Sequence, residues 1–205
     1  MATGVFRLAA ILGLVLGLAP APAVAETPAA PVQRVNAVLL QVMEEAETLG
    51  YQGRFATLAP VLAAAFDFPL MTRLSVGRHW KGLDPEQRAR LTDLFAQLSV
   101  ATFAARFDGY GGEVFRITGE APQLRGAVLV HNQLVKVTGE AVAINYLTRR
   151  TDDGWRIVDV LLDGKFSELA LRRSQYTSLL KNQGYDGLIE AMAAKVADLA
   201  DSGSD

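Results

Sequence analysis

The spacing of apolar residues changes twice along the chain, and this change limits the possible folds more than any other feature. Between residues 32 and 109 apolar side chains recur every three or four positions, as in helices that bury one face. After Gly111-Gly112 they alternate, as in strands, and from residue 167 to residue 199 the helical spacing returns. The pattern predicts an α+β fold in which N-terminal and C-terminal helices pack on a sheet.

Capping signals predict where some of these helices begin and end. Asp67 followed by Pro69 indicates the start of a short helix. The run Asp84-Pro85-Glu86-Gln87 is a stronger signal, because Asp caps a helix, Pro suits its first position and Gln lies three residues on. Gly184 is expected to separate two C-terminal helices, at 167–181 and 186–199.

Four strands are predicted, over residues 113–118, 127–137, 141–149 and 155–162. Glycines at 119, 126 and 139 and the pair Asp153-Gly154 mark the turns between them. Such short connections favour an antiparallel meander. The last two strands are apolar on both faces, so both faces of this curved four-stranded sheet are expected to be mostly covered.

Two arrangements explain a sheet covered on both faces. Either helices simply pack on both sides, or the concave face and the helices enclose an apolar cavity. In the second case one alternating set of side chains from each of the last two strands would line the cavity, because alternate side chains share a face. The candidate cavity residues are Val142, Ile144, Tyr146, Val158, Val160 and Leu162, and a one-residue shift in register would replace them by the opposite set.

The first 25 residues have the pattern of a cleavable secretory signal. One positive charge at Arg7 precedes an apolar run over residues 8–18, which is too short to cross a bilayer. Ala23-Val24-Ala25 then forms a small-x-small cleavage site. We expect cleavage after Ala25, a mature chain that begins at Glu26, and export to the periplasm.

Charge and cysteine content exclude several classes of function. The chain has 20 basic and 22 acidic residues, which argues against nucleic-acid binding through bulk positive charge. It has no cysteine, and therefore no disulfide, thiol nucleophile or cysteine-based metal site. His79 and His131 lie in different halves of the chain without metal-ligand spacing, so neither a metal nor another cofactor is expected.

One carboxylate offers an enzymatic alternative. Asp159 could act as a general base with a raised pKa in an apolar cavity, with Tyr146 as its hydrogen-bond partner, as in an isomerase or hydratase. The simpler interpretation is that Asp159 meets a basic side chain or solvent. The sequence contains no nucleophile elbow, phosphate-binding loop or dinucleotide fingerprint, so a protein without catalytic residues is expected.

Several short stretches, spread over nearly the whole mature chain, carry a family resemblance. They are FDFPLMT at 66–72, VGRHWKGL at 76–83, Gln87, Phe95, VAINYL at 142–147, GWRIVDV at 154–160 and GYDGLI at 184–189. In order and spacing they resemble the MlaC family of periplasmic phospholipid-binding proteins, also described as toluene-tolerance components of ABC transport systems. The stretch KFSELALRRS at 165–174 departs from the common pattern and is similar to the hopanoid-associated HpnM branch.

The resemblance implies one lipid-binding domain over residues 26–201, related to the NTF2-like cone, and a disordered tail at 202–205. It implies a monomeric carrier of a phospholipid or hopanoid-type lipid, with the tails inside and the headgroup in solvent. The implied partners are an inner-membrane ABC transporter complex and either an outer-membrane lipoprotein–porin complex or a hopanoid exporter. A structural or assembly protein that holds no ligand is a further alternative.

Two pairs of basic residues are candidates for polar contacts with such a lipid. Arg149-Arg150 and Arg172-Arg173 either lie on a solvated surface or contact a headgroup or an acidic partner. The second possibility rests on the guanidinium group, whose forked donors match the geometry of phosphate and carboxylate.

Overall fold

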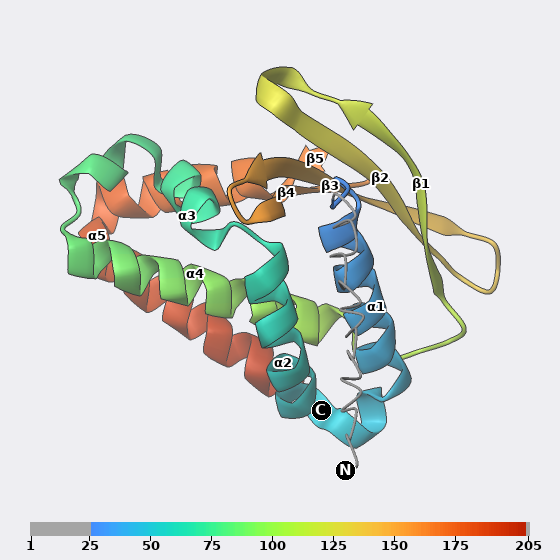
Figure 1. Ribbon diagram of the computed structural model, residues 1–205. Coiled ribbons are helices and arrows are strands. Elements are labelled where there is room, and N and C mark those ends of the chain that lie inside the picture. The colour runs from blue at the N-terminus through green and yellow to red at the C-terminus, as the bar shows by residue number, and fades with distance from the viewer. Residues whose placement is uncertain (1–25, 204–205) are drawn as a thin grey trace, which may run out of the picture.

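Helices occupy both ends of the described part of the chain and the sheet its middle, as the change in apolar spacing predicts. The computed structural model describes residues 26–203, and the expected signal segment, residues 1–25, lies outside the described residues. The elements are α1 (Ala30–Glu44), α2 (Ala46–Ala65), α3 (Phe68–Val76), the 3-10 helix η1 (Gly77–Gly82), α4 (Pro85–Arg106), β1 (Val114–Pro122), the short η2 (Leu124–Gly126), β2 (Ala127–Val135), β3 (Ala141–Thr151), β4 (Gly154–Leu162), β5 (Phe166–Ser167) and α5 (Glu168–Ser202). Figure 1 shows the sheet above a layer of helices, with α4 and α5 side by side.

The predicted helix caps are confirmed. The Asp67 side chain accepts a hydrogen bond from the Leu70 amide at 3.0 Å. At the start of α4, Asp84 and Gln87 form a reciprocal capping box, with bonds of 2.8 and 3.0 Å. These signals are local, since each cap satisfies backbone amides within the first turn of its own helix.

The sheet is antiparallel with its strands in sequence order, which confirms the predicted meander, but it has five strands and the predicted count of four is wrong. The fifth strand is only two residues long and pairs with Leu161 and Leu162. So short a strand has no alternation by which a sequence could reveal it. Gly119, expected in a turn, lies inside β1 at a shift in the pairing with β2, because glycine is tolerated at such a bulge.

A bulge in β4 decides which of its residues face the helices. Leu147 pairs with Asp159 and Thr148 pairs with Ile157, so Val158 is the extra residue. Ile157 and Val160 therefore both enter the main core, although strict alternation would place them on opposite faces.

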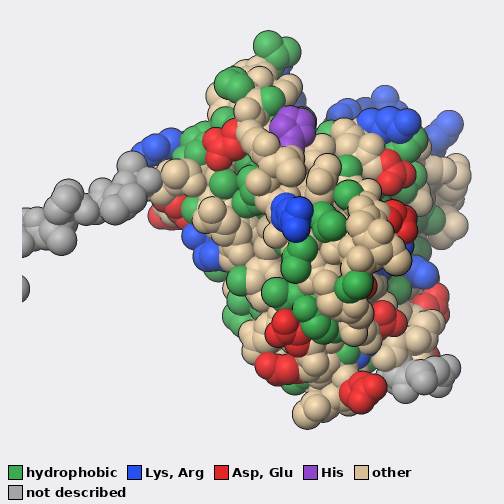
Figure 2. All heavy atoms as spheres, turned by 90° about the vertical axis from the view of Figure 1, so that its right-hand side faces the viewer, with side chains coloured by type: hydrophobic (Ala, Val, Ile, Leu, Met, Phe, Trp, Pro, Cys, Tyr) green, Lys and Arg blue, Asp and Glu red, His purple; other side chains and the backbone are tan. Residues whose placement is uncertain are grey.

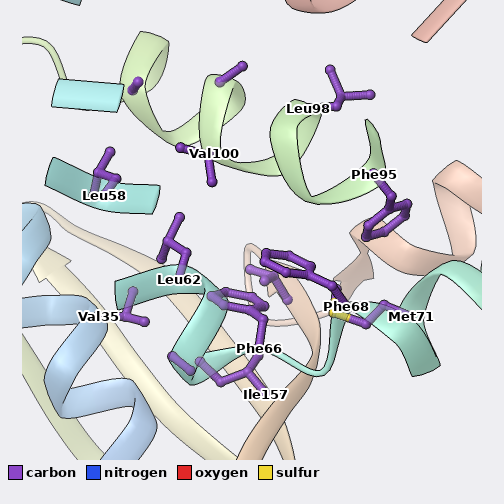
Figure 3. Packing of buried hydrophobic residues seen from close by; sticks show 14 of the residues in the cluster. Val35, Leu58, Leu62, Phe66, Phe68, Met71, Phe95, Leu98, Val100 and Ile157 are labelled. Carbon is purple, nitrogen blue, oxygen red and sulfur yellow. The ribbon is translucent and has the colours of Figure 1, made fainter. Parts of the chain in front are cut away.

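The main core lies between the inner face of the sheet and the helices. Figure 3 shows Val35 of α1, Leu62 of α2 and Ile157 of β4 around the ring of Phe66. Burial of each large apolar side chain contributes about 1.5–3 kcal/mol to stability. The expectation that both faces of the sheet are covered fails at β1, where residues alternate between exposed and half-buried.

The second half of α5 folds back on the first. Gly184 has φ 73° and ψ −167°, a left-handed φ that favours glycine, and it interrupts the helix as predicted. As a result Tyr176 and Met192, on opposite sides of this break, line the same groove against α4. No helix among residues 26–203 is long and apolar enough to cross a membrane.

Hydrogen bonds from a buried arginine hold the C-terminal end of the described chain. Arg54 is 4% exposed and donates hydrogen bonds to the carbonyl oxygens of Ala46, Ala104 and Gly203. Helix α5 extends through Ser202, so the first two residues of the segment expected to be a disordered tail are part of this arrangement. The other two, 204–205, lie outside the described residues.

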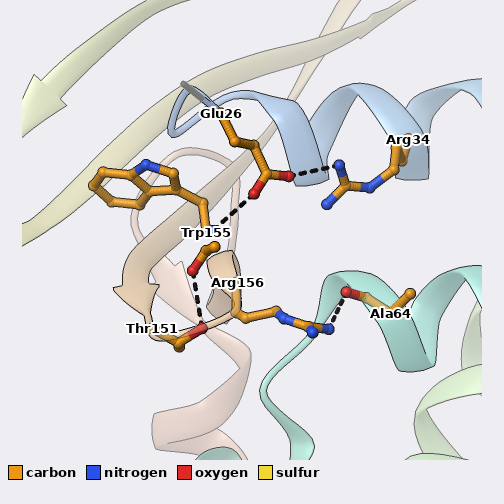
Figure 4. Close-up of polar contacts among 7 residues, drawn as sticks. Glu26, Arg34, Ala64, Thr151, Trp155 and Arg156 are labelled. Carbon is orange, nitrogen blue, oxygen red and sulfur yellow. Dashed lines mark hydrogen bonds and ion pairs between the residues drawn. The ribbon is translucent and has the colours of Figure 1, made fainter. Parts of the chain in front are cut away.

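Hydrogen bonds also hold the N-terminal end of the described chain, at Glu26 (Figure 4). Glu26 accepts hydrogen bonds from the guanidinium of Arg34 at 2.7 Å and from the Trp155 amide at 3.1 Å. Gly154 makes room for this carboxylate, because a Cβ atom at that position would overlap it. Close by, Arg156 donates to the carbonyl oxygen of Ala64, which joins β4 to the end of α2.

Acidic side chains gather at one end of the molecule. Figure 2, which faces the side of α1 and β1, shows them toward the lower part of the surface. Glu44, Glu45 and Glu47 are exposed there, at the connection between α1 and α2.

Candidate functional site

A small cavity lies between the last long strands and three helices. Its volume is about 110 Å³. Apolar side chains from α3, α4, β3, β4 and the start of α5 make up most of its wall, and five polar side chains from α4 and α5 complete it. The apolar residues are Phe66, Met71, Phe103, Phe107, Ile144, Val160, Leu162 and Leu169, and the polar ones are Ser99, Thr102, Arg106, Glu168 and Arg172.

A continuous series of aromatic rings runs past this cavity. Phe66 stacks on Phe68 at a centroid distance of 5.4 Å and meets Phe103 edge-on at 6.0 Å. Phe103 in turn stacks on Phe107 at 5.9 Å, and Phe68 meets Phe95 at 6.2 Å. Such pairs bury large apolar areas in fixed geometry, so they give the cavity a rigid wall.

Pairing with the sheet fixes one of these rings beside β4. Phe66 forms a parallel bridge with Ile157, and the Asp67 amide donates to the Ile157 carbonyl oxygen at 2.9 Å. Because Phe66 ends the helix α2 and Phe68 begins α3, this bridge holds the connection between the two helices against the strand that supplies Val160 and Leu162.

A larger groove adjoins the cavity. It has a volume of about 650 Å³ and lies between α4 and the two halves of α5. Four residues, Thr102, Arg106, Glu168 and Arg172, line both spaces and so form the boundary between them. The apolar wall of the groove consists of Leu98, Leu171, Tyr176, Leu179, Ala191, Met192 and Leu199.

The structure places the six candidate cavity residues in different positions. Ile144, Val160 and Leu162 line the cavity. Val142 is half-buried at the margin of the core, and Tyr146 is fully buried within it. Val158, the bulge residue, is 3% exposed but does not belong to the main core cluster.

The two arginine pairs do not form one site. Arg172 lies at the boundary of cavity and groove, with its guanidinium 4.9 Å from the Phe95 ring centroid and 3.3 Å from the Ser99 hydroxyl. Arg173, one residue on, faces a separate hollow beside η1. Arg149 and Arg150 are exposed at the end of β3, beside α3 and away from the cavity lining.

The arrangement required for a catalytic Asp159 is not formed. Asp159 pairs with Leu147 and Tyr146 pairs with Val160, so the two polar side chains lie on opposite faces of the sheet. The Asp159 carboxylate instead accepts hydrogen bonds from the Ser167 hydroxyl at 2.6 Å and the Leu169 amide at 3.1 Å. Burial raises the pKa of this carboxyl, while these hydrogen bonds favour its charged form.

Tyr146 has an isolated hydroxyl. The side chain is fully buried, and its oxygen has no hydrogen-bond partner within the described part of the chain. Burial raises the pKa of the phenol well above its usual range, so the Tyr146 hydroxyl stays protonated near neutral pH.

Metal-ligand chemistry has no support in the described segment. Residues 26–203 contain no group of three or more His, Asp or Glu side chains placed to hold a metal ion. His79 lies in η1 and His131 in β2, and both are half-buried.

Three of the six predicted strand residues line this cavity, and none of its helix residues except Arg172 was a predicted site residue. Phe103, Arg106 and Phe107 lie at the end of α4, where no strand alternation or family motif marked them in the sequence. The resulting space is apolar within and cationic at its boundary. Such a site can bury a hydrocarbon chain and hold a polar group at its exit.

Comparison with known proteins gives one family and one fold. The sequence pattern of the family described as MlaC protein matches residues 33–194. No curated protein matches the chain. Among solved structures, a phospholipid-binding protein from Ralstonia solanacearum, in complex with a phospholipid, superposes with a TM-score of 0.75 at 22% identity. The match covers 86% of this chain and 99% of that one, and it shows that the two share a fold.

Proposed function

Because the chain belongs to the MlaC family, we propose that it is a periplasmic carrier that holds the hydrocarbon tails of a lipid between its sheet and its helices. The observation that carries this proposal is an apolar, aromatic-walled cavity that shares four lining residues with a larger groove whose wall is partly apolar. A protein of the same fold has been solved with a phospholipid bound, which supports a lipid as the ligand.

The energetics of lipid transfer explain why such a carrier is needed. Transfer of a lipid with about 30 methylenes from a bilayer to water costs on the order of 24 kcal/mol of free energy, at ~0.8 kcal/mol for each methylene. A carrier has to replace this burial with apolar protein surface. The aromatic wall and the groove are the surfaces proposed for that role.

The cavity must enlarge to accept a lipid. Its volume of about 110 Å³ is below the roughly 300–1,000 Å³ of most ligand pockets, whereas that of the groove falls within this range. In the proposed bound state the tails extend from the cavity into the groove, past Thr102 and Arg172. This requires α4 and the first half of α5 to separate at that boundary.

The proposed cargo is a phospholipid, and a hopanoid-type lipid is the second candidate because residues 165–174 depart from the common family pattern. The proposed context is an ABC transport system, in which the chain passes lipid between inner-membrane and outer-membrane complexes. Export through the N-terminal signal, with cleavage after Ala25, would place it between those membranes.

A charge in the cavity wall tests the proposal. Val160 is 8% exposed and lines the cavity, so Val160→Glu would put an unpaired charge among acyl chains at a cost of several kcal/mol. We expect the variant to fold by circular dichroism and to purify without lipid. The matched control is Leu161→Glu, since Leu161 is half-buried on the opposite face of the same strand.

Three outcomes would decide the test. Lipid retained by Leu161→Glu and lost from folded Val160→Glu supports the proposed site. A folded Val160→Glu protein with normal lipid content contradicts it. If Val160→Glu does not fold, Leu162→Gln at the edge of the same cavity repeats the comparison with a half-buried side chain.

A further inference from the structure

Two large apolar side chains are exposed beside the cavity. Phe166 is 59% exposed and Leu171 is 53% exposed. Phe166 is the cross-strand partner of Leu162, a residue of the cavity wall, so both side chains project from the same face of the sheet. Leu171 lies one helical turn into α5 and lines the groove. Both residues therefore extend the apolar wall outward into solvent.

Basic side chains accompany this exposed apolar edge. The Lys165 ammonium lies 5.0 Å from the centroid of the Phe166 ring. Arg106 and Arg172 stand at the boundary of cavity and groove, and neither forms an ion pair within the described chain. We call Arg106, Lys165, Phe166, Leu171 and Arg172 the lip. Three acidic residues lie beside it: Asp163 in the preceding turn, Glu168 at the boundary itself, and Asp159, whose carboxylate accepts from Ser167 and Leu169.

We propose that the lip docks directly on the surface of a bilayer that contains anionic lipids, with Phe166 and Leu171 inserted among the headgroups. Aromatic and aliphatic side chains flanked by Lys and Arg are the combination by which peripheral segments bind such interfaces. This proposal rests on the proposed function. If the chain carries a lipid, docking of the lip would bring the mouth of the groove next to the membrane from which the lipid comes.

The distribution of charge favours an anionic membrane as the surface that binds the lip, and it orients the molecule with the lip toward that membrane. The chain carries a net charge of −2, whereas Arg106, Lys165 and Arg172 at the lip outnumber Asp163 and Glu168. The third carboxylate beside the lip, that of Asp159, is held by hydrogen bonds from Ser167 and Leu169. The exposed acidic residues Glu44, Glu45 and Glu47 lie at the α1–α2 connection, away from the start of α5 in Figure 1. An anionic surface would therefore attract the lip and repel that end.

Vesicle flotation tests the proposal. The mature chain is mixed with vesicles of phosphatidylcholine, with or without phosphatidylglycerol, and the bound fraction is measured against salt concentration. The test variant is Phe166→Ser with Leu171→Ser. The matched control is Leu124→Ser with Val137→Ser, because these side chains are 89% and 72% exposed and line none of the described hollows. Lipid content and circular dichroism are recorded for every protein.

We expect binding to the phosphatidylglycerol vesicles that weakens with salt, a roughly tenfold loss of partitioning for the lip variant, and no loss for the control. Equal binding by the two variants would overturn the proposal, as would wild-type protein that carries lipid but does not bind pure lipid vesicles. Lip-dependent binding that requires a membrane protein in the vesicles would also overturn it and assign the lip to a protein partner. Absence of bound lipid from every preparation would instead contradict the proposed function.

Discussion

The Tyr146 hydroxyl is buried and has no hydrogen-bond partner among residues 26–203, a condition that normally costs about 1–3 kcal/mol. Tyr146→Phe should therefore leave the free energy of unfolding unchanged or raise it by up to about 2 kcal/mol, and lipid content should not change. Urea denaturation and lipid extraction measure the two quantities. A loss of stability above 1 kcal/mol would show that the hydroxyl has a partner that the described structure does not contain.

Glu26 makes a polar contact whose strength depends on pH. The hydrogen bond from Arg34 holds the pKa of Glu26 below its usual value near 4.5. Because the pKa is lower in the folded chain than in the unfolded one, the ionised carboxylate adds stability above pH 4.5. That contribution is lost as the pH falls through the lowered folded value.

We therefore expect Glu26→Gln to reduce the free energy of unfolding by about 0.2–1 kcal/mol at pH 7, the range for a solvent-exposed ion pair. The difference from the wild type should shrink below pH 4.5. Thermal unfolding at several pH values measures it, and a difference that stays constant down to pH 3 would show that the charge of Glu26 plays no part.

Individual side chains differ in how far the sequence predicts them. Asp67 and Asp84 are predictable because a cap acts within its own helical turn. Val158 is not, since the bulge that removes it from the main core depends on pairing with β3. Arg54 also escaped prediction, because its three acceptors come from segments far apart in sequence.

At the scale of elements, the start of α5 is held to β4 by Asp159. Its carboxylate accepts from the Ser167 hydroxyl and the Leu169 amide, and Ser167 in turn caps α5 through the Ala170 amide at 2.9 Å. Since Leu169 lines the cavity, this contact positions one side of the proposed site without touching its contents.

Asp159→Asn should lower the free energy of unfolding by about 1 kcal/mol, because an amide replaces the charged acceptor. Lipid content should stay largely intact. Ser167→Ala is the matched variant, since it removes the same contact together with the helix cap, and it should cost about 1–2 kcal/mol. A turnover activity abolished by Asp159→Asn would instead favour the enzymatic alternative.

The spacing of apolar residues predicts most of the helices and strands, and the exceptions have physical causes. Strand β5 is too short to show a period, and it matters here because it carries Phe166 into the lip. The groove could not be predicted, because it arises only when the two halves of α5 fold back at Gly184 against α4. Sequence periodicity identifies a helix and its buried side but not the neighbour that covers it.

At the scale of the whole molecule, one arrangement connects the separate observations. The sheet and the aromatic rings form the fixed wall of the cavity, while α4 and α5 form the side that also borders the groove. Arg54 binds the C-terminal end of the described chain at Gly203, and Glu26 at its N-terminal end binds the Trp155 amide, both away from the cavity lining. In the proposed mechanism, separation of α4 from the first half of α5 would admit a lipid while both ends of the described chain stay in place.

Native mass spectrometry of the protein purified from the periplasm tests the central claim most directly. We predict a polypeptide that begins at Glu26 and carries one lipid, whose mass disappears after organic extraction and whose fragments distinguish a phospholipid from a hopanoid. A protein that shows only the mass of its polypeptide in every native preparation would contradict lipid carriage and favour a structural or assembly role.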